Sequence, residues 1–264
     1  MLKLQSISKR IVAAITFFTR LPLWRMMEVE PCYYKRIVPL WPLAGWITGG
    51  TMALVYWGAT SLHCPPSVAV ALALLSRILL TGALHEDGLA DFCDGFGGGT
   101  NRERTLQIMK DSHIGTFGVL GLVGYCLLWW TVLETLMTRG MSPWVFLVTD
   151  TLAKYLASTI IYVLPYARPE SESKNRYAYS YVSTAERIIS FLLGILPLAL
   201  CLWVGVPGMP HWDSWASGFG ACFVLIFFLF WTMRRRIGGY TGDCCGATML
   251  LVELTLYLSL ICVP

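Results

Sequence analysis

Long apolar runs separated by short polar connections repeat along almost the whole chain. A helix needs about 20 mostly apolar residues to cross a bilayer. Runs of that kind lie at roughly 37–62, 66–84, 114–137, 143–164, 188–206, 214–233 and 243–262. The pattern predicts an all-α, polytopic integral membrane protein with about seven transmembrane helices. Because no repeat or low-complexity linker divides the sequence, we expect residues 1–264 to form a single membrane-embedded domain.

A helix of another kind is predicted before the first span. Apolar residues recur there at helical spacing, at Leu4, Ile7, Ile11, Ile15 and Phe18. An amphipathic helix of this kind lies in the membrane interface. The run IVAAITFF is too short for a signal peptide, and no small-residue cleavage site follows it. A spanning anchor is the alternative interpretation.

Composition agrees with a lipid environment. Hydrophobic residues make up 56% of the chain and charged residues 14%, and the mean hydropathy is +0.59. Soluble domains have roughly 45–50% apolar residues. The net charge of +4 is too small an excess to indicate a nucleic-acid partner.

The positions of the basic residues predict the orientation. Lysines and arginines collect in the N-terminal segment, in the connections 85–113 and 165–187, and at 234–236. The connections at 62–66 and 207–213 hold none. Every basic connection therefore falls on one side, which is the cytoplasmic side in membrane proteins. We expect a cytoplasmic N-terminus and an outside C-terminus.

The stretch HEDGLADFCDGFGGG, residues 85–99, is unusually polar for this chain. It lies at the predicted cytoplasmic end of the second span, where the helix is expected to run on into water. The spacing of Asp87, Asp91 and Asp94 places three carboxylates on one helical face. These like charges repel one another unless a divalent cation binds. Oxygen ligands favour Mg²⁺ or Mn²⁺.

Residues that suit an anionic substrate follow at once. Glycines from Gly95 to Gly99 permit close backbone approach, and a glycine-rich turn presents N–H groups to phosphate. Arg102, Arg104 and Lys110 are candidate anion clamps. A solvated loop is the ordinary explanation of a charged connection. The clustering instead favours a Mg²⁺-dependent reaction on a phosphoryl or diphosphate substrate.

Further polar residues occur outside this stretch. The segment GGYTGDCCGA, 238–247, precedes the last span on the same predicted side and adds Asp243. Arg77, Asp150 and Lys154 lie within predicted spans, where ionisable residues face a partner or an aqueous cavity. An i,i+4 pair explains Asp150 with Lys154 equally well. Snorkelling explains Arg77 about as well as a phosphate contact.

The run ALHEDGLADFCDGFGGGTNRERTLQIMKDSHIGTFG, 83–118, closely resembles the signature of the cobalamin synthase family, the adenosylcobinamide-GDP ribazoletransferases. FFTRLPL, PLAG, YAR and GGYTGD extend the resemblance over nearly the whole chain. It implies a multi-pass enzyme of the cell inner membrane, acting late in cobalamin (vitamin B12) biosynthesis with its active site facing the cytoplasm. Such an enzyme joins adenosylcobinamide-GDP to α-ribazole or its 5′-phosphate, using Mg²⁺. It yields adenosylcobalamin or its 5′-phosphate and releases GMP.

The resemblance and the required chemistry together suggest residue roles. We expect metal ligation by Asp87, Asp91, Asp94 and Asp243, with Glu86 as a weaker candidate because it is offset on the helix. His85 and Asp111 are alternative general bases. Candidate substrate-binding residues are Gly97, Gly98, Arg102, Arg104, Lys110, Lys154 and Arg168, with Arg77 a weaker one.

The sequence departs from the family pattern at two places, and two other functions are alternatives. Lys154 stands where the family often has arginine, and PESESKNRY replaces the glycines that often follow YAR. A CDP-alcohol phosphotransferase shares an aspartate-rich D-x-x-D-G element. Its second aspartate pair is missing here, since SHIG follows Asp111. A divalent-cation carrier would have its ligands near the bilayer midplane, away from a helix end.

Overall fold

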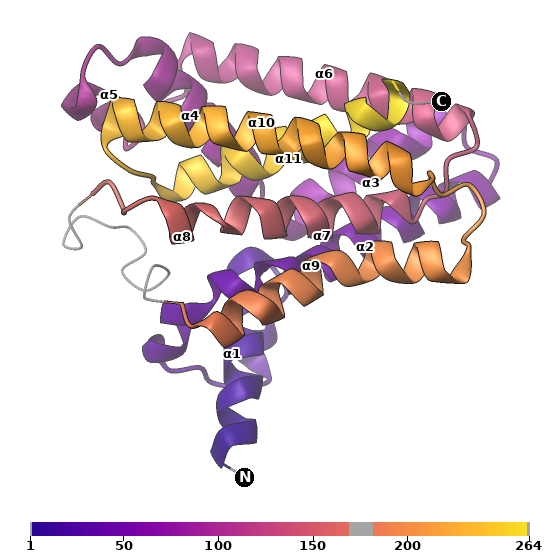
Figure 1. The fold of residues 1–264 in the computed structure, drawn as a ribbon, viewed down its shortest axis with the longest axis horizontal. Coiled ribbons are helices and arrows are strands. Elements are labelled where there is room, and N and C mark those ends of the chain that lie inside the picture. The colour runs from indigo at the N-terminus through magenta and orange to yellow at the C-terminus, as the bar shows by residue number, and fades with distance from the viewer. Residues whose placement is uncertain (1, 169–181, 263–264) are drawn as a thin grey trace.

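The computed structural model describes residues 2–168 and 182–262, and the regular elements of this part are helices (Figure 1). Three short 3-10 helices, η1 (Leu23–Arg25), η2 (Pro31–Arg36) and η3 (Val38–Leu40), follow the first helix. The α-helices are α1 (Leu2–Phe18), α2 (Trp41–Ser61), α3 (Pro66–Thr81), α4 (Leu84–Gly98), α5 (Arg102–Ile108), α6 (Thr116–Thr138), α7 (Val145–Ser158), α8 (Ile160–Val163), α9 (Thr184–Val204), α10 (Trp212–Ile237) and α11 (Gly242–Cys262). The all-α prediction is confirmed.

Six helical segments of the described chain are long and apolar enough to cross a membrane. They are α2 with η3, α6, α7 with α8, α9, α10 and α11. The predicted span at 66–84 is shorter than expected, because α3 has 16 residues. Counted with α4 as one broken span, it raises the number to seven.

The chain turns sharply where α3 meets α4. The two helices are bent by 89°, and Gly82 and Ala83 between them have φ values of +68° and +59°. The prediction that the second span runs on into water is therefore wrong. Instead α4 packs against α11 and α6. This corner carries the acidic stretch back onto the bundle.

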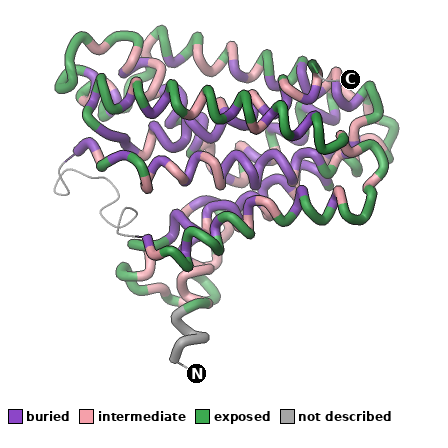
Figure 2. The backbone as a smooth tube through the Cα atoms, in the orientation of Figure 1, coloured by how far each residue is buried: buried purple, intermediate pink, exposed green. Residues whose placement is uncertain are grey.

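Burial divides the bundle into inner and outer helices (Figure 2). In the spans of α7 and α11, 72% of the residues are buried, against 28% in α6, α9 and α10. Large apolar side chains such as Leu120, Phe223 and Trp203 are exposed on these outer helices. Such an apolar surface suits contact with lipid chains. Because α7 and α11 are mostly buried, they form the core of the bundle.

The predicted N-terminal helix is present as α1, which projects from one end of the bundle (Figure 1). Ala13, Ala14 and Phe18 are buried. Arg10 ties the helix to α9 through a 2.6 Å ion pair with Glu186. Its place in the membrane interface stays a prediction.

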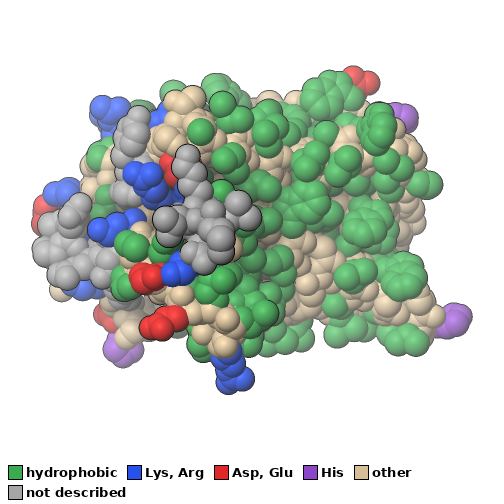
Figure 3. All heavy atoms as spheres, turned by 90° about the horizontal axis from the view of Figure 1, so that it is seen from below, with side chains coloured by type: hydrophobic (Ala, Val, Ile, Leu, Met, Phe, Trp, Pro, Cys, Tyr) green, Lys and Arg blue, Asp and Glu red, His purple; other side chains and the backbone are tan. Residues whose placement is uncertain are grey.

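Most of the charged side chains on the face shown in Figure 3 gather at one end, and apolar side chains predominate over the rest. This separation matches the alternation of basic and non-basic connections in the sequence. Residues 169–181 of the basic connection 165–187 lie outside the described residues. Which end of the bundle faces the cytoplasm stays a prediction, because the structure contains no membrane.

Candidate active site

Backbone contact between α4 and the first turn of α11 builds the site. A Cβ atom at Gly88 would lie 3.0 Å from the carbonyl oxygen of Asp243. One at Gly246 would lie 3.1 Å from that of His85. Glycine at both positions lets the helices approach closely, which brings together two polar segments far apart in the sequence.

A cavity of about 100 Å³, the α4–α11 cavity, opens at this contact. It is lined by His85 and Asp87 from α4, Asp243 from α11 and Trp41 from α2. The hydroxyl of Thr241 donates to Oδ2 of Asp243 over 3.2 Å. Arg168 adds a cation, with its Nη2 atom 3.9 Å from the same oxygen. The structure thus brings together four of the predicted site residues.

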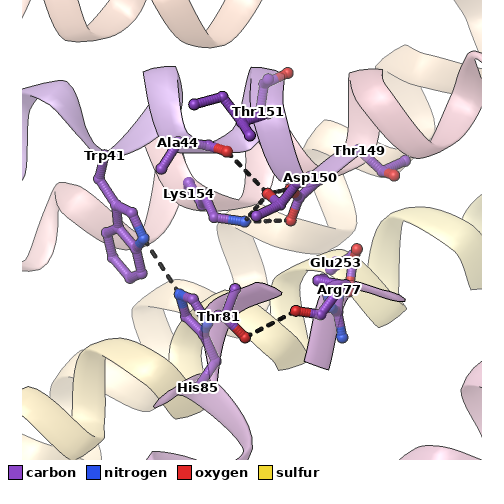
Figure 4. A network of polar contacts seen from close by, with 12 residues as sticks. Trp41, Ala44, Arg77, Thr81, His85, Thr149, Asp150, Thr151, Lys154 and Glu253 are labelled. Atoms are coloured by element: carbon purple, nitrogen blue, oxygen red, sulfur yellow. Dashed lines mark hydrogen bonds and ion pairs between the residues drawn. The ribbon is translucent and has the colours of Figure 1, made fainter. Parts of the chain in front are cut away.

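His85 is held by Trp41 (Figure 4). The indole N–H donates to Nε2 of the imidazole over 3.3 Å, and the two rings are nearly parallel, at 6°. A nitrogen that accepts a hydrogen bond carries no proton, so the neutral ring bears its proton on Nδ1. His85 therefore offers an N–H group, which disfavours it as the general base.

Asp94 caps a neighbouring helix. The backbone N–H groups of Gly115 and Gly118 donate to its two carboxylate oxygens over 2.6 and 2.8 Å. These groups are orphan donors at the N-terminus of α6. A Cβ at Gly118 would lie within 2.4 Å of the Asp94 carboxylate, so the cap requires glycine there.

The three aspartates of α4 do not form a ready-made metal site. No group of three or more acidic, histidine or cysteine residues suited to a metal ion occurs in the described chain. The helix rises 1.5 Å per residue, so Asp87 and Asp94 are separated by about 10 Å along the axis. Sharing a face is therefore insufficient for joint ligation. Asp91 lies between them, half-buried.

A second cavity, the α4–α6 cavity, has a volume of about 300 Å³. Asp94, Gly98, Arg104 and Asp111 line it together with His113. The ring nitrogen Nδ1 of His113 lies 2.7 Å from Oδ1 of Asp111. This hydrogen bond lowers the pKa of the Asp111 carboxyl below its ordinary value. Predicted site residues are thus divided between two cavities, and Lys110 is exposed beside the second.

The glycine run is helical, which corrects the predicted turn. Helix α4 continues through Gly98. A Cβ at Gly97 would lie 2.6 Å from the ring of Phe117, and one at Gly99 would lie 2.1 Å from Oγ1 of Thr105. The glycines leave room for α5 and α6, so packing explains them. Gly98 is the one that faces the α4–α6 cavity.

The side chain of Arg102 stabilises the fold through hydrogen bonds to backbone carbonyls. Its Nε and Nη2 atoms donate to the carbonyls of Ile237 and Ala167, each over 2.9 Å. These bonds fasten α5 to the end of α10. Arg104 donates to Gln107 over 2.9 Å and remains exposed at the α4–α6 cavity.

The ionisable residues inside the bundle are paired (Figure 4). Lys154 is fully buried and bonds to Asp150 and to the hydroxyl of Thr48. The i,i+4 explanation is therefore confirmed. Lys154 lines neither the α4–α11 nor the α4–α6 cavity, so its predicted substrate contact stays a prediction.

Arg77 is also buried, so snorkelling is the wrong interpretation. It pairs with Glu253 of α11 and, over 3.2 Å, with Glu86 of α4, and it donates to the hydroxyl of Tyr125 over 2.8 Å. Glu86 consequently faces the interior of the bundle. Sequence reasoning missed Glu253, although an acidic residue in a membrane span was a sufficient signal.

The fold and the site together define the class of protein. It is a polytopic, all-helical membrane protein in which acidic and basic groups line cavities at one end of the bundle. Residues 10–261 match the family model described as cobalamin-5-phosphate synthase. The chain belongs to this family, which confirms the resemblance.

Several curated relatives are similar over nearly their whole length, and the following three are named adenosylcobinamide-GDP ribazoletransferase. The protein of Leptothrix cholodnii is 37% identical over 247 residues, covering 93% of this chain and 92% of the relative. That of Leptospira interrogans is 33% identical, covering 98% and 97%. That of Shewanella sp. strain W3-18-1 is 34% identical, covering 96% and 93%. No solved structure matches the chain.

Proposed function

We propose that this protein is an adenosylcobinamide-GDP ribazoletransferase of cobalamin biosynthesis. It joins adenosylcobinamide-GDP to α-ribazole or α-ribazole 5′-phosphate and releases GMP. The family match over residues 10–261 carries this proposal. The names of relatives over nearly the full length support the same activity and do not favour a CDP-alcohol phosphotransferase.

The carboxylates at the α4–α11 cavity suit a magnesium ion. Asp87 and Asp243 reach the same cavity from different helices and offer oxygen ligands. Mg²⁺ usually takes one or two carboxylates together with waters and substrate phosphate oxygens. Asp87 and Asp243 would hold the ion, and Asp91, one turn further along α4, is the proposed third carboxylate of the site. When bound, Mg²⁺ offsets negative charge that develops on the leaving phosphate.

The protein groups divide the remaining work. The ribazole hydroxyl attacks the phosphorus next to the cobinamide linker, and the bond to GMP breaks. His85 donates its Nδ1–H to a phosphate oxygen, since Trp41 occupies the other nitrogen. Arg168 is buried beside Asp243 and donates to the carbonyl of Leu106, and its Nε–H, which has no partner among the described residues, would contact a phosphate group. Asp111 is ionised at neutral pH and is the proposed acceptor of the hydroxyl proton. It lines the α4–α6 cavity, so in this proposal the ribazole hydroxyl is delivered from that side.

We place the enzyme in the cell inner membrane with its charged end toward the cytoplasm. The basic connections at that end support this orientation under the positive-inside rule. The cytoplasmic side is also where nucleotide substrates are available to an enzyme that releases GMP.

The test is a transferase assay on the full-length protein, purified in detergent or reconstituted in liposomes. Adenosylcobinamide-GDP and α-ribazole are supplied with and without Mg²⁺, and GMP and the corrinoid product are measured together. We expect both products in equal amounts and only with Mg²⁺. Folded protein that forms neither product would refute the activity, and CDP-alcohol substrates assayed in parallel would identify the alternative.

A further inference from the structure

A larger hollow adjoins the α4–α11 cavity and has no role in the account so far. It has a volume of about 710 Å³ and lies between α1 and the corner that joins α3 to α4. Its lining includes Thr16, Phe17, Arg20, Trp24 and Asp87. Phe17 and Asp87 also line the α4–α11 cavity. The two hollows therefore meet at a carboxylate of the proposed metal site, and we call the larger one the α1 cavity.

Arg20 is fixed across the α3–α4 corner. Its backbone N–H donates to the carbonyl of Leu80 over 2.7 Å. A Cβ atom at Gly82 would lie 2.0 Å from Nε of Arg20, so the side chain rests directly on the glycine. The left-handed conformation of Gly82, with φ of +68°, creates this space. The corner thus positions the guanidinium at the wall of the α1 cavity.

Two polar side chains of this wall, those of Arg20 and Thr16, lack partners among the described residues, whereas the hydroxyls of Thr19 and Thr81 donate to backbone carbonyls. Arg20 is exposed and makes no side-chain hydrogen bond or ion pair with the described residues, whereas Arg10 and Arg77 are both paired. The hydroxyl oxygen of Thr16 is buried and likewise has no hydrogen-bond partner among these residues. Buried polar atoms are normally hydrogen-bonded, so the unsatisfied hydroxyl of Thr16 points to a bound ligand, and the exposed guanidinium that lines the same cavity offers donors to an anionic one.

We propose that Arg20 binds the diphosphate of the nucleoside-diphosphate-linked substrate, with the α1 cavity receiving the group that the diphosphate carries. This inference rests on the proposed function. A planar guanidinium matches phosphate oxygens in a way that a lysine ammonium cannot. Arg20 also counters the charge of Asp87, which by itself repels an anion. Phe17 and Trp24 provide apolar wall for a large, flat ligand.

A structural role is the competing explanation. Arg20 lies at the C-terminal end of α3, where a cation stabilises the free carbonyls of the last turn. Such a role affects folding and leaves substrate affinity unchanged. The two explanations therefore predict different measurements.

The experiment compares wild type with Arg20→Ala, Arg20→Lys and Arg25→Ala. Arg25 is an exposed arginine five residues on that does not line the cavity, so it serves as the matched control. The KM for adenosylcobinamide-GDP is measured with free α-ribazole, which contains no phosphate. Inhibition by inorganic pyrophosphate, its direct binding by calorimetry and thermal unfolding are measured in the same preparations.

For Arg20→Ala we expect a rise in KM for the diphosphate substrate and a weakening of pyrophosphate inhibition, each of roughly ten-fold or more. The KM for α-ribazole should not change, and Arg25→Ala should match wild type. Arg20→Lys keeps the charge at the helix end and should still raise the KM several-fold. If Arg20→Ala does not fold, Arg20→Lys provides the test.

Unchanged KM and unchanged pyrophosphate inhibition in folded Arg20 variants would overturn the proposal. Altered thermal unfolding without a change in KM would show that Arg20 only stabilises the fold. Unchanged pyrophosphate inhibition is also expected if a lipid phosphate binds there, and that result would likewise contradict the proposal. Inactive wild type with normal pyrophosphate binding would instead count against the proposed function. The failures of the two proposals are thus distinguishable.

Discussion

The indole N–H of Trp41 and Nε2 of His85 form a 3.3 Å hydrogen bond between α2 and α4 at the wall of the α4–α11 cavity. Because the indole is only a donor, this bond selects one tautomer of the imidazole. The remaining N–H of His85 is then the group available to a ligand. A buried aromatic residue thereby decides what a histidine in the acidic motif can do.

Replacing Trp41 by Phe should lower kcat more than it raises KM, by roughly ten-fold for a lost orienting hydrogen bond. The ring of Phe keeps the packing but cannot donate, so Nε2 of His85 loses its partner. Steady-state kinetics of the purified variant would measure this. Trp46→Phe is the control, because Trp46 donates to the carbonyl of Leu193 over 2.9 Å in a different part of the bundle. Equal losses in both variants would contradict a specific role.

Asp91→Asn should abolish transfer while leaving the protein folded. The amide is nearly isosteric with the carboxylate but cannot supply the negative charge that the proposed metal site requires. Product formation and thermal unfolding are measured over a range of Mg²⁺ concentrations. A wild-type turnover rate in the purified variant would contradict the proposed role of Asp91 in the metal site.

Asp94→Ala should instead lower stability. The carboxylate accepts two backbone N–H groups at the start of α6. A hydrogen bond to a charged group contributes about 1.5–3 kcal/mol. We therefore expect a lower thermal midpoint in Asp94→Ala than in Asp91→Asn. The same midpoint in both variants would show that the cap contributes nothing.

Arg77→Met should destabilise the bundle strongly. The change leaves Glu253 and Glu86 as buried carboxylates without a cation, and breaking a buried pair costs about 3–5 kcal/mol. Changing Glu253 to Gln in the same chain should recover part of the loss. Thermal unfolding in detergent compares the two variants. A double variant no more stable than Arg77→Met would contradict the pairing.

The acid limb of the pH–activity profile should depend on His113. Its hydrogen bond lowers the pKa of the Asp111 carboxyl, so the carboxylate form persists to lower pH. If Asp111 accepts the hydroxyl proton, activity is lost as the pH falls through this pKa. His113→Ala removes the bond and raises the pKa, which should move the acid limb of kcat/KM to higher pH. An unmoved limb would exclude Asp111 as the base.

The sequence by itself determined the helical fold class and the family. Apolar runs of membrane length predict spans because each spanning helix satisfies its own backbone hydrogen bonds, whatever lies beside it. The motif around Asp87 and Asp91 identified the family for a similar reason, since residue type and spacing are local properties of the chain.

Only the tertiary structure decided how these parts are used. The corner at Gly82 and Ala83 turned an expected water-exposed helix onto α11, and the approach of α6 made Asp94 a helix cap. The partner of Arg77 proved to be Glu253, which is distant in sequence. These outcomes depend on which helices pack together. That choice is made by contacts between remote residues, which no local pattern contains.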